Sequence, residues 1–135
     1  MKKQVLVTGG TGYIGSHTAV ELINEGFEVI IIDNLCNSQS NVIDGIEKIT
    51  GIRPKLEIFD LCDAVKVGAF FEKYPHIEAV IHFAALKAVG ESVKEPLNYY
   101  RNNLVALMNL LECMKAGKSV NLIFSSSCTV YGQPD

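Results

Sequence analysis

The chain has 135 residues, 48% of them hydrophobic, and a formal net charge of −3 from 12 basic and 15 acidic side chains. This length suits one domain with a sizeable core, and the small negative charge argues against nucleic acid or an anionic membrane as the main partner. The four cysteines are widely spaced, so we expect reduced thiols, a cytoplasmic location and neither a disulfide framework nor a metal site: Cys36, Cys62, Cys113 and Cys128. No apolar run approaches the length of a membrane span.

The start of the chain predicts a strand, a tight turn and a helix. An apolar run over residues 5–8 ends at a group of glycines, and an amphipathic pattern follows. The glycines fit two registers, Gly9-x-x-Gly12-x-x-Gly15 and Gly10-x-Gly12-x-x-Gly15, and the second is the dinucleotide fingerprint. Glycines at this spacing permit a tight turn, a close approach of the backbone to a pyrophosphate and close packing of helix on strand. The helix N-terminus that follows favours phosphate binding.

A second strand over residues 27–33 is rich in β-branched side chains, which is typical of a strand buried on both faces of a parallel sheet. It ends at Asp33, roughly 20 residues after the glycines, where the fingerprint places an acid that binds the adenosine ribose. The alternative is a loop aspartate that caps the next turn.

Strands and helices continue to alternate along the chain. We expect helices from about residue 42 to Gly51, from Asp63 to residue 74, and from Leu97 to residue 116, and strands over residues 56–59, 79–83 and 120–124. Residues 84–92 read as a small, flexible stretch, and His82 is interpreted as a packed core histidine rather than a catalyst. The pattern predicts an α/β fold, a doubly wound parallel (Rossmann) sheet of strand order 3-2-1-4-5.

The polar or small residues that end the strands are expected to meet at one edge of this sheet. They are Asp33, Asp60, Ala84-Ala85 and the serines at 125–127. Ligands of doubly wound sheets bind at the carboxyl ends of the strands. The sequence therefore predicts one site, assembled from several strand ends.

Six segments of the chain resemble the extended short-chain dehydrogenase/reductases, and within them the UDP-glucose 4-epimerase group. These segments are residues 8–18, 33–38, 60–61, 83–92, 99–103 and 125–132. The segment FAALKAVGES over residues 83–92 is the most discriminating, because its second half is similar to the galactose epimerases in particular. The resemblance covers nearly the whole chain.

The resemblance implies an NAD cofactor. Asp33 would accept from the ribose 2′-hydroxyl and repel a 2′-phosphate, and residues 34–40 contain no Arg or Lys to neutralise that phosphate. The cofactor-binding residues come from every expected strand end but the last, together with the long helix: Gly9, Gly12, Tyr13, Ile14, Gly15, Asp33, Asn34, Leu35, Cys36, Asn37, Ser38, Asp60, Leu61, Phe83, Ala84, Ala85, Leu86, Lys87 and Asn102.

The resemblance also implies a reaction without net redox change on UDP-glucose and UDP-galactose. The sugar is oxidised at C4 by NAD, the 4-keto sugar turns over in the pocket, and the hydride returns to its opposite face. Ser127 would hydrogen-bond the C4 hydroxyl and the base that deprotonates it. The alternative for residues 125–127 is a capped turn after a strand.

One departure from the family concerns its base, the tyrosine of a Tyr-x-x-x-Lys motif. No tyrosine here has a lysine four places on, because Tyr13, Tyr74, Tyr99, Tyr100 and Tyr131 are followed there by His17, Glu78, Asn103, Leu104 and Asp135. We therefore interpret residues 1–135 as the N-terminal portion of an epimerase. It would be an NAD-binding domain without the remaining strands and the sugar-binding domain, and inactive alone.

Two other functions stay open, namely another nucleotide-sugar epimerase or dehydratase of the extended family, and a non-catalytic NAD-binding sensor. The resemblance further implies a homodimer through the helix from Leu97. That helix has more large apolar side chains than packing against one sheet face requires, although all of them could instead face the sheet. They are Leu104, Leu107, Met108, Leu111 and Met114.

Overall fold

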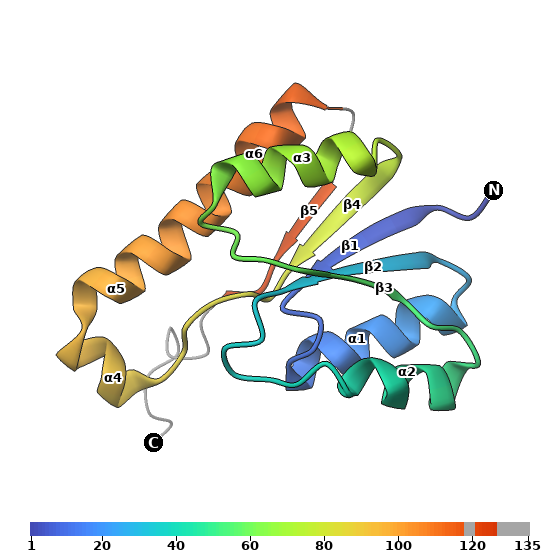
Figure 1. The fold of residues 1–135 in the computed structure, drawn as a ribbon, viewed down its shortest axis with the longest axis horizontal. Coiled ribbons are helices and arrows are strands. Elements are labelled where there is room, and N and C mark those ends of the chain that lie inside the picture. Colours follow the sequence, from blue (N-terminus) through green and yellow to red (C-terminus); the bar gives the residue numbers. More distant parts are fainter. Residues whose placement is uncertain (118–120, 127–135) are drawn as a thin grey trace, which may run out of the picture.

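Five parallel strands form the centre of the computed structural model, which describes residues 1–117 and 121–126. The strands are β1 (Gln4–Thr8), β2 (Glu28–Asp33), β3 (Lys55–Ile58), β4 (Ile77–His82) and β5 (Asn121–Phe124). They pair in the order β3-β2-β1-β4-β5, which confirms the predicted topology (Figure 1).

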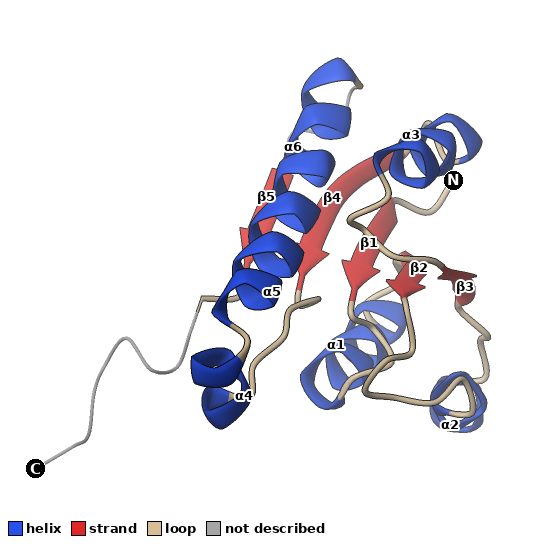
Figure 2. Cartoon of the chain, turned by 60° about the vertical axis from the view of Figure 1, so that its left-hand side comes forward, coloured by secondary structure: helices blue, strands red, loops and turns tan. Residues whose placement is uncertain are grey.

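Helices cover both faces of the sheet (Figure 1). One face carries α1 (Tyr13–Asn24) and α2 (Val42–Thr50), and the other carries α3 (Ala64–Lys73) and the long helix made of α5 (Pro96–Tyr100), η1 (Arg101–Val105) and α6 (Ala106–Ala116). A short helix, α4 (Val89–Lys94), lies at the end of this long helix (Figure 2).

The middle of β2 shows why the sheet is buried on both faces. Ile30, Ile31 and Ile32 are at most 1% exposed, and successive side chains of a strand point to opposite faces. Ile31 therefore packs with Ile43 of α2, whereas Ile30 and Ile32 join the core that contains Leu110 of α6. The continuous β-branched run of the sequence corresponds to this two-sided burial.

The register of the central strands aligns the strand ends that form the site. Thr8, the last residue of β1, lies opposite Ile32 of β2 and His82 of β4. The loops after these three strands therefore leave the sheet side by side at its carboxyl edge.

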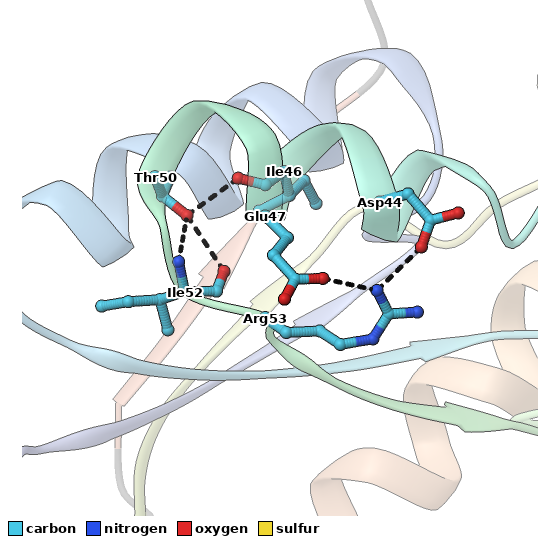
Figure 3. A network of polar contacts seen from close by, with 6 residues as sticks. All are labelled: Asp44, Ile46, Glu47, Thr50, Ile52 and Arg53. Atoms are coloured by element: carbon cyan, nitrogen blue, oxygen red, sulfur yellow. Dashed lines mark hydrogen bonds and ion pairs between the residues drawn. The ribbon is translucent and has the colours of Figure 1, made fainter.

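Local signals explain several helix ends. The Asp63 carboxylate accepts the N–H of Lys66 at 3.1 Å, so the predicted N-cap of α3 is confirmed. At the end of α2, the Thr50 hydroxyl lies 2.8 Å from the carbonyl oxygen of Ile46 and accepts the N–H of Ile52 (Figure 3). Arg53, in the same turn, contacts two carboxylates of α2.

The structure corrects two predictions about the segment after β4. Residues 84–92 were expected to lack regular structure, but residues 89–94 form α4. The helix from Leu97 is not uniform, because Arg101–Val105 is a π-helical turn. Both features contact side chains beyond the reach of a local pattern: the N–H of Ala88 bonds the Tyr99 hydroxyl, and the π-helical turn meets the Cys62 thiol.

In the described part of the chain, none of the helices is both long enough and apolar enough to cross a membrane.

Candidate functional site

A cavity of about 480 Å³ lies at the carboxyl edge of the sheet, where the sequence predicted a site. Its walls come from the loops after the first four strands and from the long helix. The residues that line it are Gly9, Gly12, Tyr13, Ile14, Gly15, Ile32, Asp33, Asn34, Cys36, Asn37, Ser38, Phe59, Asp60, Leu61, Phe83, Ala84, Ala85, Leu86, Lys87, Ala88, Glu91, Tyr99, Asn102 and Ala106.

The glycine turn supplies one wall as bare backbone. Gly9 has a φ of +67°, which glycine adopts without strain, and a Cβ atom there would lie 2.8 Å from the amide nitrogen of Ala84. A Cβ atom on Gly15 would lie 2.2 Å from the carbonyl oxygen of Gly9. Gly9, Gly12 and Gly15 line the cavity, whereas Gly10 packs against the side chain of Ile31. The turn and the start of α1 together form a surface that suits a pyrophosphate.

The Asp33 carboxylate stands at the end of β2 and is held in place by backbone groups. Its Oδ2 accepts the N–H of Thr11 at 3.2 Å, and its Oδ1 accepts the N–H of Leu35 at 2.8 Å. Asp33 therefore orders its own loop, as the alternative interpretation expected, and it also lines the cavity, while its binding to a ribose stays a prediction. The Ser38 hydroxyl also donates to Oδ1 of Asp33, at 3.5 Å. A carboxylate has about four acceptor positions, so Asp33 can still accept from a ribose hydroxyl.

The loop after β3 is held against the long helix. The buried Asn109 side chain donates to the carbonyl oxygen of Leu61 at 2.8 Å, and the Cys62 thiol lies 3.6 Å from the carbonyl oxygen of Asn102 in the π-helical turn. Burial raises the pKa of the Cys62 thiol, so it stays protonated. Asp60 and Leu61 are thereby fixed on the cavity wall.

A buried polar pair connects the ends of β1 and β4. The Thr8 hydroxyl oxygen accepts the N–H groups of Phe83 and Ala84, both at 3.2 Å, and lies 2.6 Å from Nδ1 of His82. Because the oxygen already accepts two hydrogen bonds, the hydroxyl donates to Nδ1, which assigns the proton of the neutral ring to Nε2. Burial, with a smaller contribution from Lys87, lowers the pKa of His82 to about 4.

His82 is 3% exposed and its ring stacks on Phe124 of β5, so the structure places it in the core. Its contact with Thr8 nevertheless fixes the point where the chain leaves β4 and enters the cavity wall.

Asn102 and Asn103 of the π-helical turn have different partners. The Asn103 side chain accepts the N–H of Leu86 at 2.9 Å and donates to the carbonyl oxygen of Leu86 at 3.1 Å. Asn102 lines the cavity and donates to the Asn103 side-chain oxygen at 3.0 Å. The Asn103 amide therefore holds the wall that carries Lys87, and the Asn102 amide in turn bonds Asn103.

The cavity brings together nearly all of the residues that were predicted to bind a cofactor. The exception is Leu35, which does not line the cavity and has a φ of +59° in the loop that Asp33 orders. Ser127, the predicted partner of the sugar hydroxyl, lies outside the described residues. Whether the lining residues bind a cofactor stays a prediction.

Six lining residues were not predicted: Ile32, Phe59, Ala88, Glu91, Tyr99 and Ala106. The apolar ones carry no motif that separates them from ordinary core positions. Glu91 and Tyr99 meet through a hydrogen bond across eight residues of chain, a spacing that no local rule connects.

Within residues 1–117 and 121–126, no group of three or more His, Cys, Asp or Glu side chains could hold a metal ion. Three of the cysteines, Cys36, Cys62 and Cys113, are free thiols there.

Comparison with known proteins gives a consistent picture. The family model described as GDP-mannose 4,6 dehydratase matches residues 6–135. A UDP-glucose 4-epimerase from Yersinia pestis is 56% identical over 128 residues, which cover 95% of this chain. The chain spans only 38% of the length of that protein.

Two solved structures share both fold and sequence with the chain. A UDP-glucose 4-epimerase from Stenotrophomonas maltophila, with NAD and formylated UDP-arabinopyranose bound, is 48% identical with a TM-score of 0.90 over 98% of this chain and 39% of its own. A UDP-glucose 4-epimerase from Bifidobacterium longum, in complex with NAD+ and UDP, is 47% identical with a TM-score of 0.91 over 96% of this chain and 38% of its own.

Proposed function

We propose that this chain binds NAD in the cavity, because it belongs to the GDP-mannose 4,6-dehydratase family of extended short-chain dehydrogenase/reductases. UDP-glucose 4-epimerases are among its relatives. In this proposal it supplies the cofactor half of a UDP-glucose 4-epimerase. The observation that carries the proposal is the glycine turn with Asp33 beside it. Bare backbone at the start of α1 faces the same cavity as a fixed carboxylate.

Asp33 would select NAD over NADP. The hydroxyls of the adenosine ribose can donate to its carboxylate, whereas a 2′-phosphate would be repelled by it. Residues 34–40 contain no Arg or Lys that could neutralise such a phosphate.

The nicotinamide would lie toward the wall formed by residues 83–87 and Asn102. When bound, the cofactor supplies reversible oxidation of the sugar at C4. The chain's own residues orient it: Lys87 contributes a positive charge at this wall, and the Asn103 amide holds the backbone of Leu86 beside it.

The substrates proposed for the whole protein are UDP-glucose and UDP-galactose. Ser127 would hydrogen-bond the sugar C4 hydroxyl, and a tyrosine activated by a lysine would remove its proton. Residues 1–135 contain no Tyr-x-x-x-Lys sequence. We therefore propose that this chain alone binds the cofactor without epimerising the sugar, since general-base catalysis contributes roughly 10²–10⁴-fold to a rate.

The proposal extends to a homodimer through the long helix. Leu97, Leu104, Met108 and Leu111 are 44–77% exposed, whereas Met114 is 6% exposed and belongs to the core. The helix thus presents an apolar stripe away from the sheet, of a kind that a second copy covers in symmetric dimers. Sedimentation tests this: a monomer at micromolar concentration would contradict it, and Met108→Glu should dissociate a dimer.

A cytoplasmic location is part of the same proposal. The described cysteines are free thiols, and a reducing compartment would keep them so.

Calorimetric titration of the chain with NAD and with NADP tests the main proposal. We expect NAD to bind more tightly than NADP. Asp33→Ala should weaken the binding of NAD and reduce the difference in affinity between the two cofactors. Asp44→Ala, which removes an exposed carboxylate from α2, is the charge-matched control and should leave both affinities unchanged. Tighter binding of NADP, or an Asp33→Ala variant that binds like the original, would contradict the proposal.

An assay for conversion of UDP-galactose in the presence of NAD tests the second part. We expect no turnover above background from residues 1–135. Turnover near that of a complete epimerase would mean that a base exists within these residues.

A further inference from the structure

The cavity wall from Leu86 to Glu91 is held in place by side chains of the long helix rather than by the sheet. At one end of this wall the Asn103 amide pairs with both backbone groups of Leu86. At the other end the Tyr99 hydroxyl accepts the N–H of Ala88 at 3.1 Å. Lys87 lies between Leu86 and Ala88. The two side chains that hold these neighbours, Asn103 and Tyr99, are one helical turn apart.

The contacts of Tyr99 resemble a capping box with an extra group inserted. Ala88 is the N-cap residue of α4, and Glu91 is the third residue of that helix. In a capping box the acid at this third position accepts directly from the N-cap N–H. Here the Tyr99 hydroxyl stands between them, since it accepts from Ala88 and donates to the Glu91 carboxylate at 2.8 Å.

Helix α4 has few other sources of stability. It has six residues, none of them buried, and isolated helices shorter than about 12 residues are marginal in water. Val89 and Val93 are 64% and 78% exposed, so α4 is not held by its apolar side chains. Alanine at the N-cap position offers no side-chain acceptor. The Tyr99 hydroxyl is therefore the main polar link between α4 and the rest of the fold.

Tyr99 is suited to hold this position. Tyr99 is 8% exposed, whereas its neighbour Tyr100 is 66% exposed. Burial and the hydrogen bond to Glu91 raise the pKa of the Tyr99 hydroxyl, so it keeps the proton that it donates.

We propose that Tyr99 is a positioning residue for cofactor binding: its hydroxyl, placed between Ala88 and Glu91, orders the wall from Leu86 to Glu91 and holds Lys87 at the nicotinamide end of the cavity. This inference rests on the proposed binding of NAD. It assigns to Tyr99 an effect on the nicotinamide half of the cofactor and none on the adenosine half.

The test is calorimetric titration of the chain and its Tyr99→Phe variant with NAD and with ADP-ribose, which lacks the nicotinamide. We expect Tyr99→Phe to lower the affinity for NAD about tenfold, which is the scale of one hydrogen bond to a charged group. The affinity for ADP-ribose should stay within about twofold of the original. Tyr100→Phe removes the exposed hydroxyl of the next residue and should change neither affinity.

Two variants of Glu91 test the hydrogen bond from Tyr99, since one keeps its acceptor and the other removes it. Glu91→Gln keeps an oxygen that can accept from Tyr99, so its NAD affinity should stay within about threefold of the original. Glu91→Ala removes the acceptor and should behave like Tyr99→Phe, which also secures the test if Tyr99→Phe does not fold. In a Lys87→Ala background, Tyr99→Phe should have almost no further effect on NAD affinity, because the two act on the same contact.

Three results would overturn the inference. One is a Tyr99→Phe variant that binds NAD as the original does. Another is an equal loss for NAD and ADP-ribose, which would indicate damage to the whole fold. The third is full additivity with Lys87→Ala. Failure of the original chain to bind NAD would instead overturn the proposed function, and the inference with it.

Discussion

The two walls of the cavity are built in different ways. The wall that we propose to face adenosine, called the adenosine wall (residues 9–15 and 33–38), consists of a backbone turn packed tightly against strand ends and of a carboxylate held by nearby N–H groups. The wall that we propose to face the nicotinamide, called the nicotinamide wall (residues 83–91), leaves the sheet after β4 and is held by side chains of the long helix.

This difference indicates which wall tolerates change. Where backbone meets backbone, a single added carbon has no room, because protein interiors are close-packed. Where side chains hold a loop, loss of one contact removes one or two hydrogen bonds and the loop can still form. We therefore expect substitutions of the glycines in the adenosine wall to act on folding, and substitutions of the side chains that hold the nicotinamide wall to act on affinity.

Gly15→Ala breaks the adenosine wall and should have the largest effect. The new Cβ would lie 2.2 Å from the carbonyl oxygen of Gly9, so backbone must shift. We expect a loss of roughly 3–5 kcal/mol in the free energy of unfolding, with no NAD binding. Gly45→Ala in α2, where a Cβ meets nothing within 4 Å, is the matched control and should stabilise the chain by up to about 1 kcal/mol in chemical denaturation.

His82 lies where the two walls meet, and its titration should make stability depend on pH. Its pKa of about 4 in the folded chain is below the ordinary 6.5, so the unfolded chain binds more protons between these values. The free energy of unfolding should therefore fall as the pH drops from 6.5 toward 4, by about 3 kcal/mol in total, at about 1.4 kcal/mol per unit of pKa.

Denaturant titrations across this pH range measure the effect. His82→Asn, whose side chain does not titrate, should remove most of the slope between pH 6.5 and 4. An unchanged slope would assign the effect to other groups.

Asn103→Ala weakens the nicotinamide wall. The substitution removes two hydrogen bonds to Leu86, worth about 2 kcal/mol together, so NAD affinity should fall while the fold remains. Asn98→Ala, at an exposed position of the same long helix, should bind NAD as the original does. A similar loss in both variants would speak against a specific role of Asn103.

Arg53→Ala removes polar contacts that belong to neither wall. Arg53 contacts Asp44 and Glu47, both at 2.7 Å, on the outer surface at the end of α2 (Figure 3). All three side chains are about half exposed, and exposed ion pairs contribute little to stability. The melting temperature should fall by less than about 2 °C, with NAD affinity unchanged; a larger drop would show that this network holds the β3 edge.

The adenosine wall could be predicted from sequence because its determinants are local. The glycine spacing, the β-branched run before Asp33 and the alternation of strands and helices each follow from neighbouring residues. The strand order then follows from general rules of parallel sheets.

The nicotinamide wall could be located but not explained in this way. Its position after β4 was predicted, yet α4, the π-helical turn and the role of Tyr99 were not. The Tyr99 hydroxyl contacts groups 8 and 11 residues away, and the Cys62 thiol contacts the π-helical turn from 40 residues away. Such pairs leave no periodic trace in a single sequence.

The central claim is that NAD occupies the cavity against both walls, and amide hydrogen exchange with and without NAD tests it most directly. We expect slower exchange on binding in residues 9–15 and in residues 84–91, with the larger change in the second segment, because its helix α4 is only marginally held. Residues 44–53 should not change. Unaltered exchange at either wall in the presence of saturating NAD would show that NAD does not occupy the cavity in this way.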